Sequence, residues 1–527
     1  MSVASPPERR DGVGAREIKQ QFSIDWLDYH GRYDADQLAA VDLASGRRFS
    51  YGEFNRRLRR LAAGLQRHFG IRKGDRVAVI AENSTDLFEM LFACWAIGAA
   101  LMPLNWRLTA REVRAILANG EPSLVIVDEA FAPLLRGTTL PLLMRQEEVA
   151  PSDYEALISQ SDENFRAADL TIDDLGTLLY TSGTTGRPKG VIGTFRMMRD
   201  TIIHHALHGE LTGSSRSLTC APLFHAAGLY GFSMPVFHYG GTLYVMRQWD
   251  PKQFLDLVTD PKVGITHTVG VPAQYAMVAE LPEFRRAEFP ALRVAAVGGA
   301  PITQELLENW AARGVHLSQT YGLTEAFSVA ILPPQQAREK IGSVGHRMMH
   351  TRLKIADDRG RLVQPGEVGE IMVRGPAVTP GYWRNPEETE KAFLDGWLRT
   401  GDAGVIREDG TVFIVDRYKD MFISGGENVY PAEIENVLTD MPEIYAAAVI
   451  GVADPKWGQV GLAAIQLRAG ADLDEERVRA FCAERLARYK LPRHLHFVDR
   501  LPFNAQGKVR KDVLRRHFAT NGAPAED

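Results

Sequence analysis

The chain has 527 residues, more than one ordinary domain, which predicts two or more units that each bury a core. Its 61 Lys and Arg against 66 Asp and Glu leave a formal charge of −5, so no net basic field exists to hold nucleic acid. Cys94, Cys220 and Cys482 lie far apart, which predicts neither a disulfide framework nor a thiolate metal site. A small-molecule substrate is favoured.

The chain carries no sequence signal for a membrane or for export. The N-terminal segment mixes charges of both signs where a secretory signal needs an apolar core. The most apolar stretch, Met90 to Leu104, is about fifteen residues long and predicts a buried helix, since roughly twenty residues are needed to cross a bilayer. We expect a cytoplasmic protein without a transmembrane segment, and the sequence leaves monomer and homodimer open.

β-rich runs alternate with apolar helical patterns through the first half of the chain, which predicts an α/β fold with layered, largely parallel sheets. The segment from Arg374, dense in glycine, proline and aromatic residues, predicts a β-rich end to this large unit. From Tyr418 the pattern is that of a compact α+β unit. We expect a large domain over residues 1–416 and a small domain over residues 417–527.

The most informative segment is LLYTSGTTGRPKG, Leu178 to Gly190. Glycines let the backbone fold closely, hydroxyls and free N–H groups donate to phosphate oxygens, and a lysine supplies positive charge. A Walker A loop is excluded, because it requires GxxxxGK followed by Ser or Thr. The segment predicts an anion-binding loop that uses Thr181, Ser182, Gly183, Thr184, Thr185, Gly186 and Lys189.

This loop resembles the phosphate-binding motif of the adenylate-forming superfamily, which includes acyl-CoA synthetases, firefly-type luciferases and peptide-synthetase adenylation domains. The segment QTYGLTEA, residues 319–326, matches a second motif of that superfamily. The resemblance implies that Tyr321 lies against the adenine, that Gly322 belongs to the nucleotide-binding residues and that Thr324 hydrogen-bonds the α-phosphate. It also implies that Glu325 holds Mg²⁺, which prefers hard carboxylate oxygens.

Later segments match the superfamily in the same order. RTGDAG supplies Asp402, whose oxygens suit the ribose hydroxyls. In DRYKD the resemblance implies that Arg417 reaches the ribose or phosphate and that Lys419 is the hinge between the two domains. LPFNAQGKVRK resembles the loop that carries the superfamily's mobile lysine, here Lys508. The turn in SGGEN would form the path for the pantetheine arm of coenzyme A, with Ser424, Gly425 and Gly426.

The resemblance implies an AMP-forming ligase that works in two steps. The acid attacks the α-phosphorus of ATP and pyrophosphate leaves, helped by Lys508 and by Mg²⁺ on Glu325 and Thr184. The thiol of coenzyme A then attacks the acyl-adenylate and releases AMP. Between the steps the small domain would rotate about its hinge and exchange Lys508 for the Gly425 loop.

The segment APLFHAAGLYGF, residues 221–232, resembles the substrate side of the superfamily's site. His225 stands where amino-acid-activating relatives usually place an aspartate, which disfavours an amino-acid substrate and suits a gating role. We expect a hydrophobic monocarboxylic acid, a fatty acid first, with aryl, hydroxycinnamate and alicyclic acids as alternatives. The predicted walls of the acyl pocket are His225, Tyr230, Gly298, Gly299, Ala300 and Phe327.

Other activities that share these motifs remain to be weighed. Transfer of the acyl group to a carrier protein is the main alternative, since only the acceptor differs. Luciferase-type oxygenation would need a luciferin pocket. A scaffold that only binds ATP would predict loss of Lys508, Glu325 or Asp402, and the sequence keeps all three.

Overall fold

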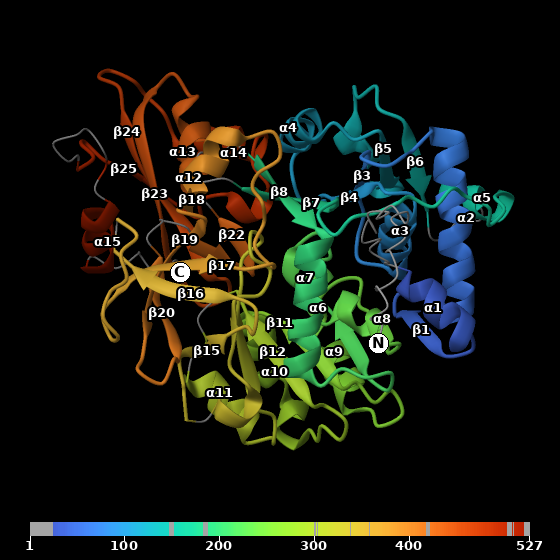
Figure 1. The fold of residues 1–527 in the computed structure, drawn as a ribbon. Coiled ribbons are helices and arrows are strands. Elements are labelled where there is room, and N and C mark those ends of the chain that lie inside the picture. The colour runs from blue at the N-terminus through green and yellow to red at the C-terminus, as the bar shows by residue number, and fades with distance from the viewer. Residues whose placement is uncertain are drawn as a thin grey trace, which may run out of the picture.

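The structure is a computed structural model that describes residues 25–146, 152–182, 188–299, 302, 304–337, 339–357, 359–417, 422–429, 431–502, 509 and 511–520. Three sheets organise it, two in the N-terminal part and one in the C-terminal part (Figure 1). This confirms the predicted α/β fold with a large and a small domain. The boundary at residues 416 and 417 adjoins residues outside the described ranges and stays a prediction.

The six-stranded sheet has the order β6-β5-β3-β4-β7-β8, parallel except for the antiparallel β7–β8 pair. On β3, Val77 and Val79 pack with α2, α3 and α5, whereas Ala78 and Ile80 pack with α4. Helices therefore cover both faces, which explains the continuous apolar runs. The bounds are β3 Arg76–Ile80, β4 Ala100–Pro103, β5 Leu124–Asp128, β6 Leu142–Arg145, β7 Leu175–Ser182, β8 Pro188–Thr194, α2 Tyr51–Phe69, α3 Thr85–Ala96, α4 Ala110–Gly120, η1 Glu129–Leu135 and α5 Asp153–Gln160.

The helix predicted over the apolar stretch Met90 to Leu104 is wrong in extent. Helix α3 ends at Ala96, and the residues after it form β4. Between them Gly98 has a φ of 78°, a left-handed conformation that a glycine adopts without a steric penalty and that commonly ends a helix. The stretch was apolar throughout because helix and strand are both buried.

The second, 14-stranded sheet has the order β16-β17-β19-β20-β15-β14-β13-β12-β11-β9-β10-β1-β2, with β18 paired to β19. It is parallel from β13 to β1 and antiparallel from β14 to β16. Its strands are β1 Leu38–Asp42, β2 Arg48–Ser50, β9 Arg216–Thr219, β10 Thr242–Val245, β11 His267–Gly270, β12 Val294–Gly298, β13 Leu317–Tyr321, β14 Ala330–Ile331, β15 Ser343–Arg347, β16 Arg352–Ala356, β17 Gly369–Arg374, β18 Phe393–Leu394, β19 Trp397–Ile406 and β20 Val412–Arg417.

Helices of the large domain surround this sheet and carry parts of the site. They are α1 Trp26–Tyr33, α6 Phe195–Gly209, α7 Ala226–Tyr230, α8 Ser233–His238, α9 Pro251–Thr259, α10 Pro272–Ala279, η2 Pro282–Arg286, α11 Gln304–Ala311, η3 Pro334–Gln336 and α12 Pro386–Ala392.

The small domain is a sheet with helices on both faces. Val449 of β23 packs with α13 and α14, while Ala448 and Ile450 pack with α15. Its elements are β21 Phe422–Ser424, β22 Glu427–Val429, α13 Pro431–Thr439, β23 Ile444–Asp454, β24 Gly458–Leu467, α14 Glu475–Ala483, η4 Arg488–Lys490, β25 His494–Phe497 and α15 Lys511–Thr520.

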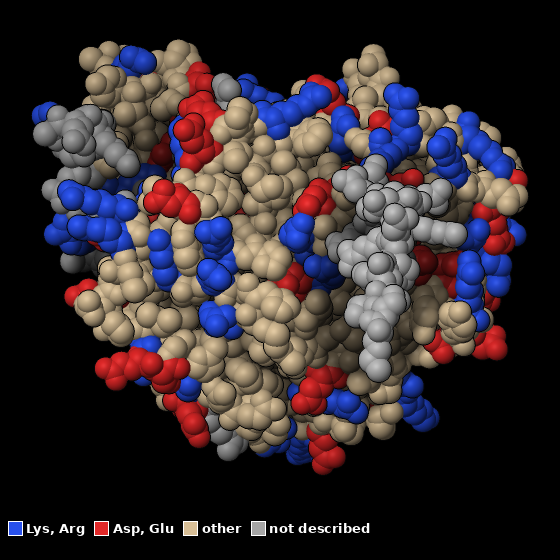
Figure 2. All heavy atoms as spheres, in the orientation of Figure 1, with Lys and Arg blue, Asp and Glu red and all other residues tan. Residues whose placement is uncertain are grey.

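The surface agrees with the balanced composition. Figure 2 shows acidic and basic residues interspersed over the visible face rather than one broad basic patch. In the described part of the chain, every helix is too short or too polar to span a bilayer.

Candidate active site at the domain interface

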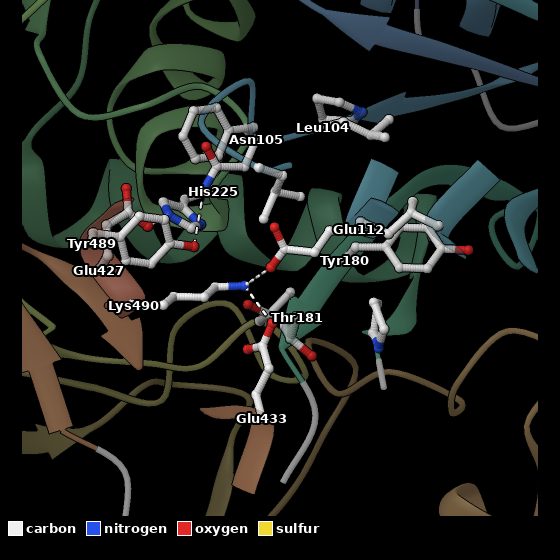
Figure 3. Close-up of a pocket in the computed structure, with 16 residues that line it drawn as sticks. Leu104, Asn105, Glu112, Tyr180, Thr181, His225, Glu427, Glu433, Tyr489 and Lys490 are labelled. Carbon is white, nitrogen blue, oxygen red and sulfur yellow. Dashed lines mark hydrogen bonds and ion pairs between the residues drawn. The ribbon is translucent and has the colours of Figure 1, made fainter. Parts of the chain in front are cut away.

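A pocket lies between the two domains (Figure 3). The large domain lines it with Thr181 at the end of β7, His225 just before α7, and Thr324 after β13. The small domain contributes Glu427 from β22 and Lys490 from η4. The pocket therefore brings residues of the predicted phosphate loop, nucleotide segment and acyl pocket beside the small domain.

The predicted phosphate loop joins β7 to β8. The two strands pair antiparallel up to Ser182 opposite Pro188, so the hairpin holds both ends of the loop together. Lys189 forms an ion pair with Glu388 of α12 and lies 5.1 Å from the ring centre of Tyr382. The Lys189 hydrogen bond holds the pKa of Glu388 below its usual value. The predicted residues Gly183, Thr184, Thr185 and Gly186 lie outside the described residues, as does the side chain of Ser182.

The two segments predicted to hold the nucleoside meet in the structure. The Tyr321 hydroxyl donates a hydrogen bond of 2.6 Å to Oδ2 of Asp402, which lies 81 residues further on. Tyr321 ends β13, and its side chain packs in the core between β13 and the antiparallel strands. The following Gly322 leaves no room for a side chain, since a Cβ there would lie 2.0 Å from the carbonyl oxygen of Phe327.

Glu325, the predicted magnesium ligand, is partly exposed and accepts a 2.7 Å hydrogen bond from the Tyr382 hydroxyl at Oε1. Tyr382 thus lies between Glu325 and Lys189, whose ammonium faces its ring. A partly exposed carboxylate beside the phosphate loop suits a hard cation. The second predicted magnesium ligand, Thr184, lies outside the described residues.

The hinge segment is described only in part. Asp402 on β19 stands opposite Arg417 on β20 in an antiparallel pair, so the backbones of these two predicted ribose residues are neighbours. The side chain of Arg417 and the whole of Lys419 lie outside the described residues. The same holds for the predicted catalytic lysine, Lys508.

The Ser424–Gly426 turn reaches the large domain. Gly425 and Gly426 have φ values of 58° and 85°, which glycine adopts without a steric penalty. A Cβ on Gly425 would lie 2.8 Å from the Trp457 ring, and one on Gly426 would lie 3.4 Å from the side chain of Val271 in the large domain. Ser424 is buried at the start of this turn.

Just after that turn, Glu427 joins the domains through two ion pairs. Its Oε2 lies 2.7 Å from Nε2 of His225, and its Oε1 accepts a hydrogen bond of 2.5 Å from Nη1 of Arg107. Burial favours the neutral acid, but His225 and Arg107 together hold the pKa of Glu427 below its usual value. His225, predicted as a gate, is therefore tied to the small domain.

A second ionic contact crosses the interface nearby. The Lys490 ammonium donates hydrogen bonds of 2.7 Å to Glu112 of α4 and 2.7 Å to Glu433 of α13 (Figure 3). Only 3% of the Lys490 side chain is exposed. Burial raises the pKa of Glu433 to about 7, which Lys490 opposes and the charge of Glu112 reinforces. One lysine thus serves two buried carboxyl groups.

The predicted acyl-pocket walls are closely packed. The rings of Tyr230 and Phe327 stack with centres 4.1 Å apart, and the Tyr230 hydroxyl forms a hydrogen bond with Thr177 of β7. Phe327 has a φ of 36°, a strained conformation for an aromatic residue and one that is often found at functional sites. Gly298 ends β12 with Gly299 next to it at a φ of 80°, and Ala300 lies outside the described residues.

Several contributors to this site were not predicted. The sequence assigned no role to four of them: Arg107, Glu112, Tyr382 and Lys490. The sequence TARE marks Glu112 as a helix-capping residue, and it does cap α4, but nothing in that pattern reveals its second partner 378 residues away.

Comparison with known proteins agrees with this geometry. The family model of the AMP-binding enzyme matches residues 27–383, and that of the AMP-binding enzyme C-terminal domain matches residues 433–508. The chain belongs to the AMP-binding enzyme family. The predicted membership of the adenylate-forming superfamily is thereby confirmed, and so is the prediction that the protein is an enzyme.

Its curated relatives act on different acids, to judge by their names. A feruloyl-CoA synthase of Amycolatopsis sp. is 40% identical over 90% of this chain and 94% of its own. A 2-succinylbenzoate–CoA ligase of Geobacillus sp. is 37% identical over 95% and 99%. A long-chain-fatty-acid–CoA ligase of Mycobacterium tuberculosis is 35% identical over 91% and 95%.

One relative of known structure has been solved in two forms. The o-succinylbenzoate CoA synthetase of Bacillus subtilis, as a double mutant bound with its product analogue OSB-NCoA, superimposes with a TM-score of 0.84, 30% identity and coverage of 93% and 98%. The same protein with the acyl-adenylate intermediate OSB-AMP gives a TM-score of 0.69 at 30% identity and coverage of 93% and 97%. At nearly equal identity and coverage, this chain therefore superimposes better on the product-analogue complex than on the acyl-adenylate complex.

Proposed function

We propose that this enzyme is an acid–CoA ligase that makes an acyl-adenylate from ATP and a hydrophobic monocarboxylic acid and then transfers the acyl group to coenzyme A. The observation that carries the proposal is the place of the Ser424–Gly426 turn: a Cβ on Gly426 would lie 3.4 Å from the side chain of Val271, and the next residue, Glu427, hydrogen-bonds His225. A glycine turn against the large domain, next to a gating residue, leaves room for a slender arm such as pantetheine.

In the first step the chain's own groups would position ATP. Tyr321 and Asp402, joined by their hydrogen bond, would hold the nucleoside, and Thr181 and Thr324 on the pocket wall would face the phosphates. Mg²⁺, with Glu325 as a ligand, would neutralise charge on the departing pyrophosphate. Lys508 would add a cation at the α-phosphate after the small domain rotates about Lys419.

In the second step the small domain would keep the position that it has in the structure, with Glu427 bound to His225. The higher TM-score with the product-analogue complex supports the assignment of this domain position to thioester formation. The His225–Glu427 contact would then report that the small domain has closed, which is the form in which the gate and the glycine turn lie side by side. The names of the three relatives described above support coenzyme A as acceptor, whereas a 36% identical relative of Streptomyces coeruleorubidus is named a fatty acid–[acyl-carrier-protein] ligase and supports the carrier protein as the alternative.

For the acid, the packing favours a compact aromatic carboxylate. Tyr230, at the end of α7, and Phe327 stack their rings in the buried core, so a long straight chain at these walls would have to displace them. The feruloyl and succinylbenzoyl groups, which appear in the names of two relatives, are compact. A fatty acid is the second candidate, supported by the long-chain relative at 35% identity.

A panel of acids tests the substrate and the acceptor together. Hydroxycinnamates, arylacetates and fatty acids of increasing length would be scored for acid-dependent AMP release and for thioester with free CoA or with a holo-carrier protein. We expect the largest kcat/KM with an aromatic acid and free CoA. Preference for a long-chain acid would replace the aromatic assignment, and preference for the carrier would overturn the proposed acceptor.

The mechanism is tested by Lys508→Ala. Removal of one electrostatic donor typically costs about 2.7 to 4 kcal/mol. Acid-dependent pyrophosphate exchange should therefore fall by about 10² to 10³-fold, while thioester formation from synthetic acyl-adenylate persists. Lys252→Ala, which removes an exposed lysine of α9, is the control and should leave both steps unchanged. Equal loss of both steps in Lys508→Ala would contradict the assignment.

A further inference from the structure

A group of three potential metal ligands lies in the large domain, apart from the pocket. Asp200 and His204 are one turn apart on α6, and His350 lies in the turn between β15 and β16. One ligand atom from each residue lies within 4.8 Å of the other two. Asp200 and His204 are buried, whereas 40% of the His350 side chain is exposed. The group is therefore rooted in the core and open on one side.

The hydrogen bonds of this group leave two acceptors facing each other. The backbone N–H of His350 donates to Nε2 of His204 at 3.2 Å, so that nitrogen carries a lone pair and no hydrogen. Asp200 Oδ2 lies 3.4 Å from the same nitrogen and has no hydrogen-bond partner among the described residues. A buried carboxylate oxygen without a partner is costly. A cation between the two atoms would bind the carboxylate oxygen and would take the place of the His350 N–H at Nε2 of His204.

We propose that Asp200, His204 and His350 bind a divalent transition-metal cation of the Zn²⁺ type. Zinc bonds of about 2.1 Å in tetrahedral geometry place ligands about 3.4 Å apart, which matches the Asp200–His204 separation. His350 Nδ1 now hydrogen-bonds Oδ1 of Asp200 at 2.5 Å and would move outward slightly to become the third ligand. Its exposed side leaves the fourth position to water. Two imidazoles and a carboxylate suit zinc better than Mg²⁺, which prefers oxygen.

A metal here would join two parts of the large domain. Helix α6 follows β8 of the six-stranded sheet, while β15 and β16 belong to the antiparallel end of the other sheet (Figure 1). The next residue on α6, His205, hydrogen-bonds Ser328 at 2.9 Å, immediately after Phe327. The site is therefore a structural cross-link behind the Tyr230–Phe327 pair, and its loss should lower thermal stability more than it changes the chemical steps.

Metal binding by the full-length enzyme tests the proposal. The enzyme would be stripped with a chelator, equilibrated with Zn²⁺ alone and then desalted. By elemental analysis we expect wild type to retain one more equivalent of zinc than His350→Ala, and Zn²⁺ to raise the Tm of wild type only. His350 is exposed, so this variant should fold. Asp200→Asn, of nearly equal volume, should lose the same equivalent, and Mg²⁺ should not substitute.

His68→Ala, which removes an exposed histidine of α2, is the matched control and should bind zinc as wild type does. Equal zinc content in wild type, His350→Ala and Asp200→Asn would overturn the proposal and leave the three residues as a hydrogen-bonded group without a metal. The readout is metal content, so failure here is separable from failure of the proposed ligase activity.

Discussion

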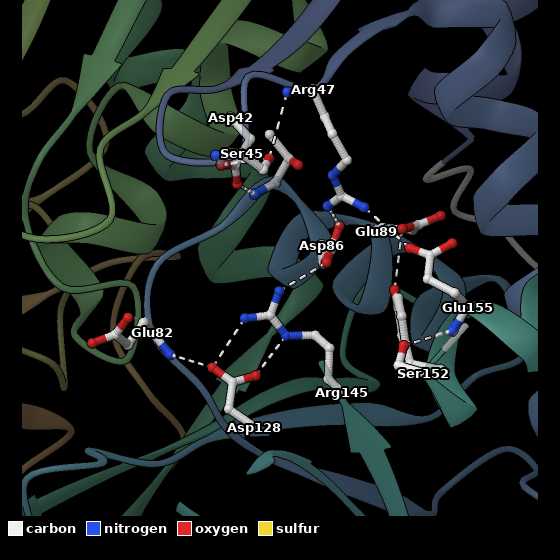
Figure 4. Close-up of polar contacts among 12 residues, drawn as sticks. Asp42, Ser45, Arg47, Glu82, Asp86, Glu89, Asp128, Arg145, Ser152 and Glu155 are labelled. Atoms are coloured by element: carbon white, nitrogen blue, oxygen red, sulfur yellow. Dashed lines mark hydrogen bonds and ion pairs between the residues drawn. The ribbon is translucent and has the colours of Figure 1, made fainter. Parts of the chain in front are cut away.

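Two buried ionic clusters differ in where their members come from. In the large domain, Arg145 is 3% exposed and bonds Asp86 at 2.9 Å and Asp128 at 2.6 Å, with Arg47 also paired to Asp86 (Figure 4). All these residues belong to the N-terminal part of one domain. At the interface, Lys490 of the small domain pairs with Glu433 of its own domain and with Glu112 of the large one (Figure 3).

The charge balance of the clusters also differs. Burial opposes ionisation of Asp86, but Arg145 and Arg47 hold its pKa below the usual value. At the interface one lysine faces two carboxyl groups, and burial raises the pKa of Glu433 to about 7. An internal cluster is broken only by unfolding, whereas Glu112 can separate from Lys490 when the domains part. We infer that the first stabilises the fold and the second stabilises one domain arrangement.

The largest expected effect is that of Arg145→Met. The change removes the Arg145 cation from buried Asp86, which keeps Arg47, and from partly exposed Asp128. Breaking a buried ion pair typically costs about 3 to 5 kcal/mol. Calorimetry should show a marked fall in the Tm of the enzyme. Arg67→Met removes an exposed arginine that pairs with Asp162 and should leave the Tm unchanged. If Arg145→Met had the Tm of wild type, the cluster in the large domain would not stabilise the fold, and its contrast with the interface cluster would fail.

Lys490→Met should act on catalysis instead. Loss of the cation favours parting of the domains, since Glu112 and Glu433 would lose the ammonium that joins them in the closed form. We expect thioester formation from synthetic acyl-adenylate to fall about tenfold, equivalent to about 1.4 kcal/mol, with pyrophosphate exchange less affected. Lys262→Met, at an exposed lysine, is the control. An equal fall in both half-reactions would show that Lys490 does not discriminate between the arrangements.

The interface should also respond to pH. In the closed arrangement Glu433 has a pKa of about 7, and exposure to water would bring it towards the ordinary value of about 4.3. The closed form therefore binds more protons between these values, so it is favoured as pH falls from 8 to 6 and weakened as pH rises through 7. Fluorescence energy transfer between the domains would measure this. Glu433→Gln, which stays neutral, should flatten the profile, and an unchanged profile would contradict the assignment.

The smallest effect is expected for Arg107→Gln. Arg107 is 37% exposed, and Glu427 keeps His225 as a partner, so solvent screening limits the loss to less than about 1 kcal/mol. The KM for CoA should rise two- to threefold or less, with the Tm unchanged. A larger effect than that of Lys490→Met would reverse the order of importance within the interface.

Much of the site could be predicted because its residues lie in ordered local motifs. The glycine- and hydroxyl-rich loop was predicted from its residue types, and Tyr321 and Asp402 from their resemblance to superfamily motifs. The structure joins Tyr321 to Asp402. The magnesium, hinge and lysine assignments of Thr184, Lys419 and Lys508 remain predictions. The boundary between α3 and β4 was missed because both elements are buried and share one apolar pattern.

The sequence by itself determined the α/β class, which depends on local composition and periodicity, and the superfamily, through the resemblance of its ordered motifs. Only the tertiary structure decided which charges meet. Lys490 and Glu112 are 378 residues apart, and Arg107 and Glu427 are 320 apart. An ion pair depends on distance and burial, which no local pattern encodes, so the contacts that hold the two domains together appear only when the chain is folded.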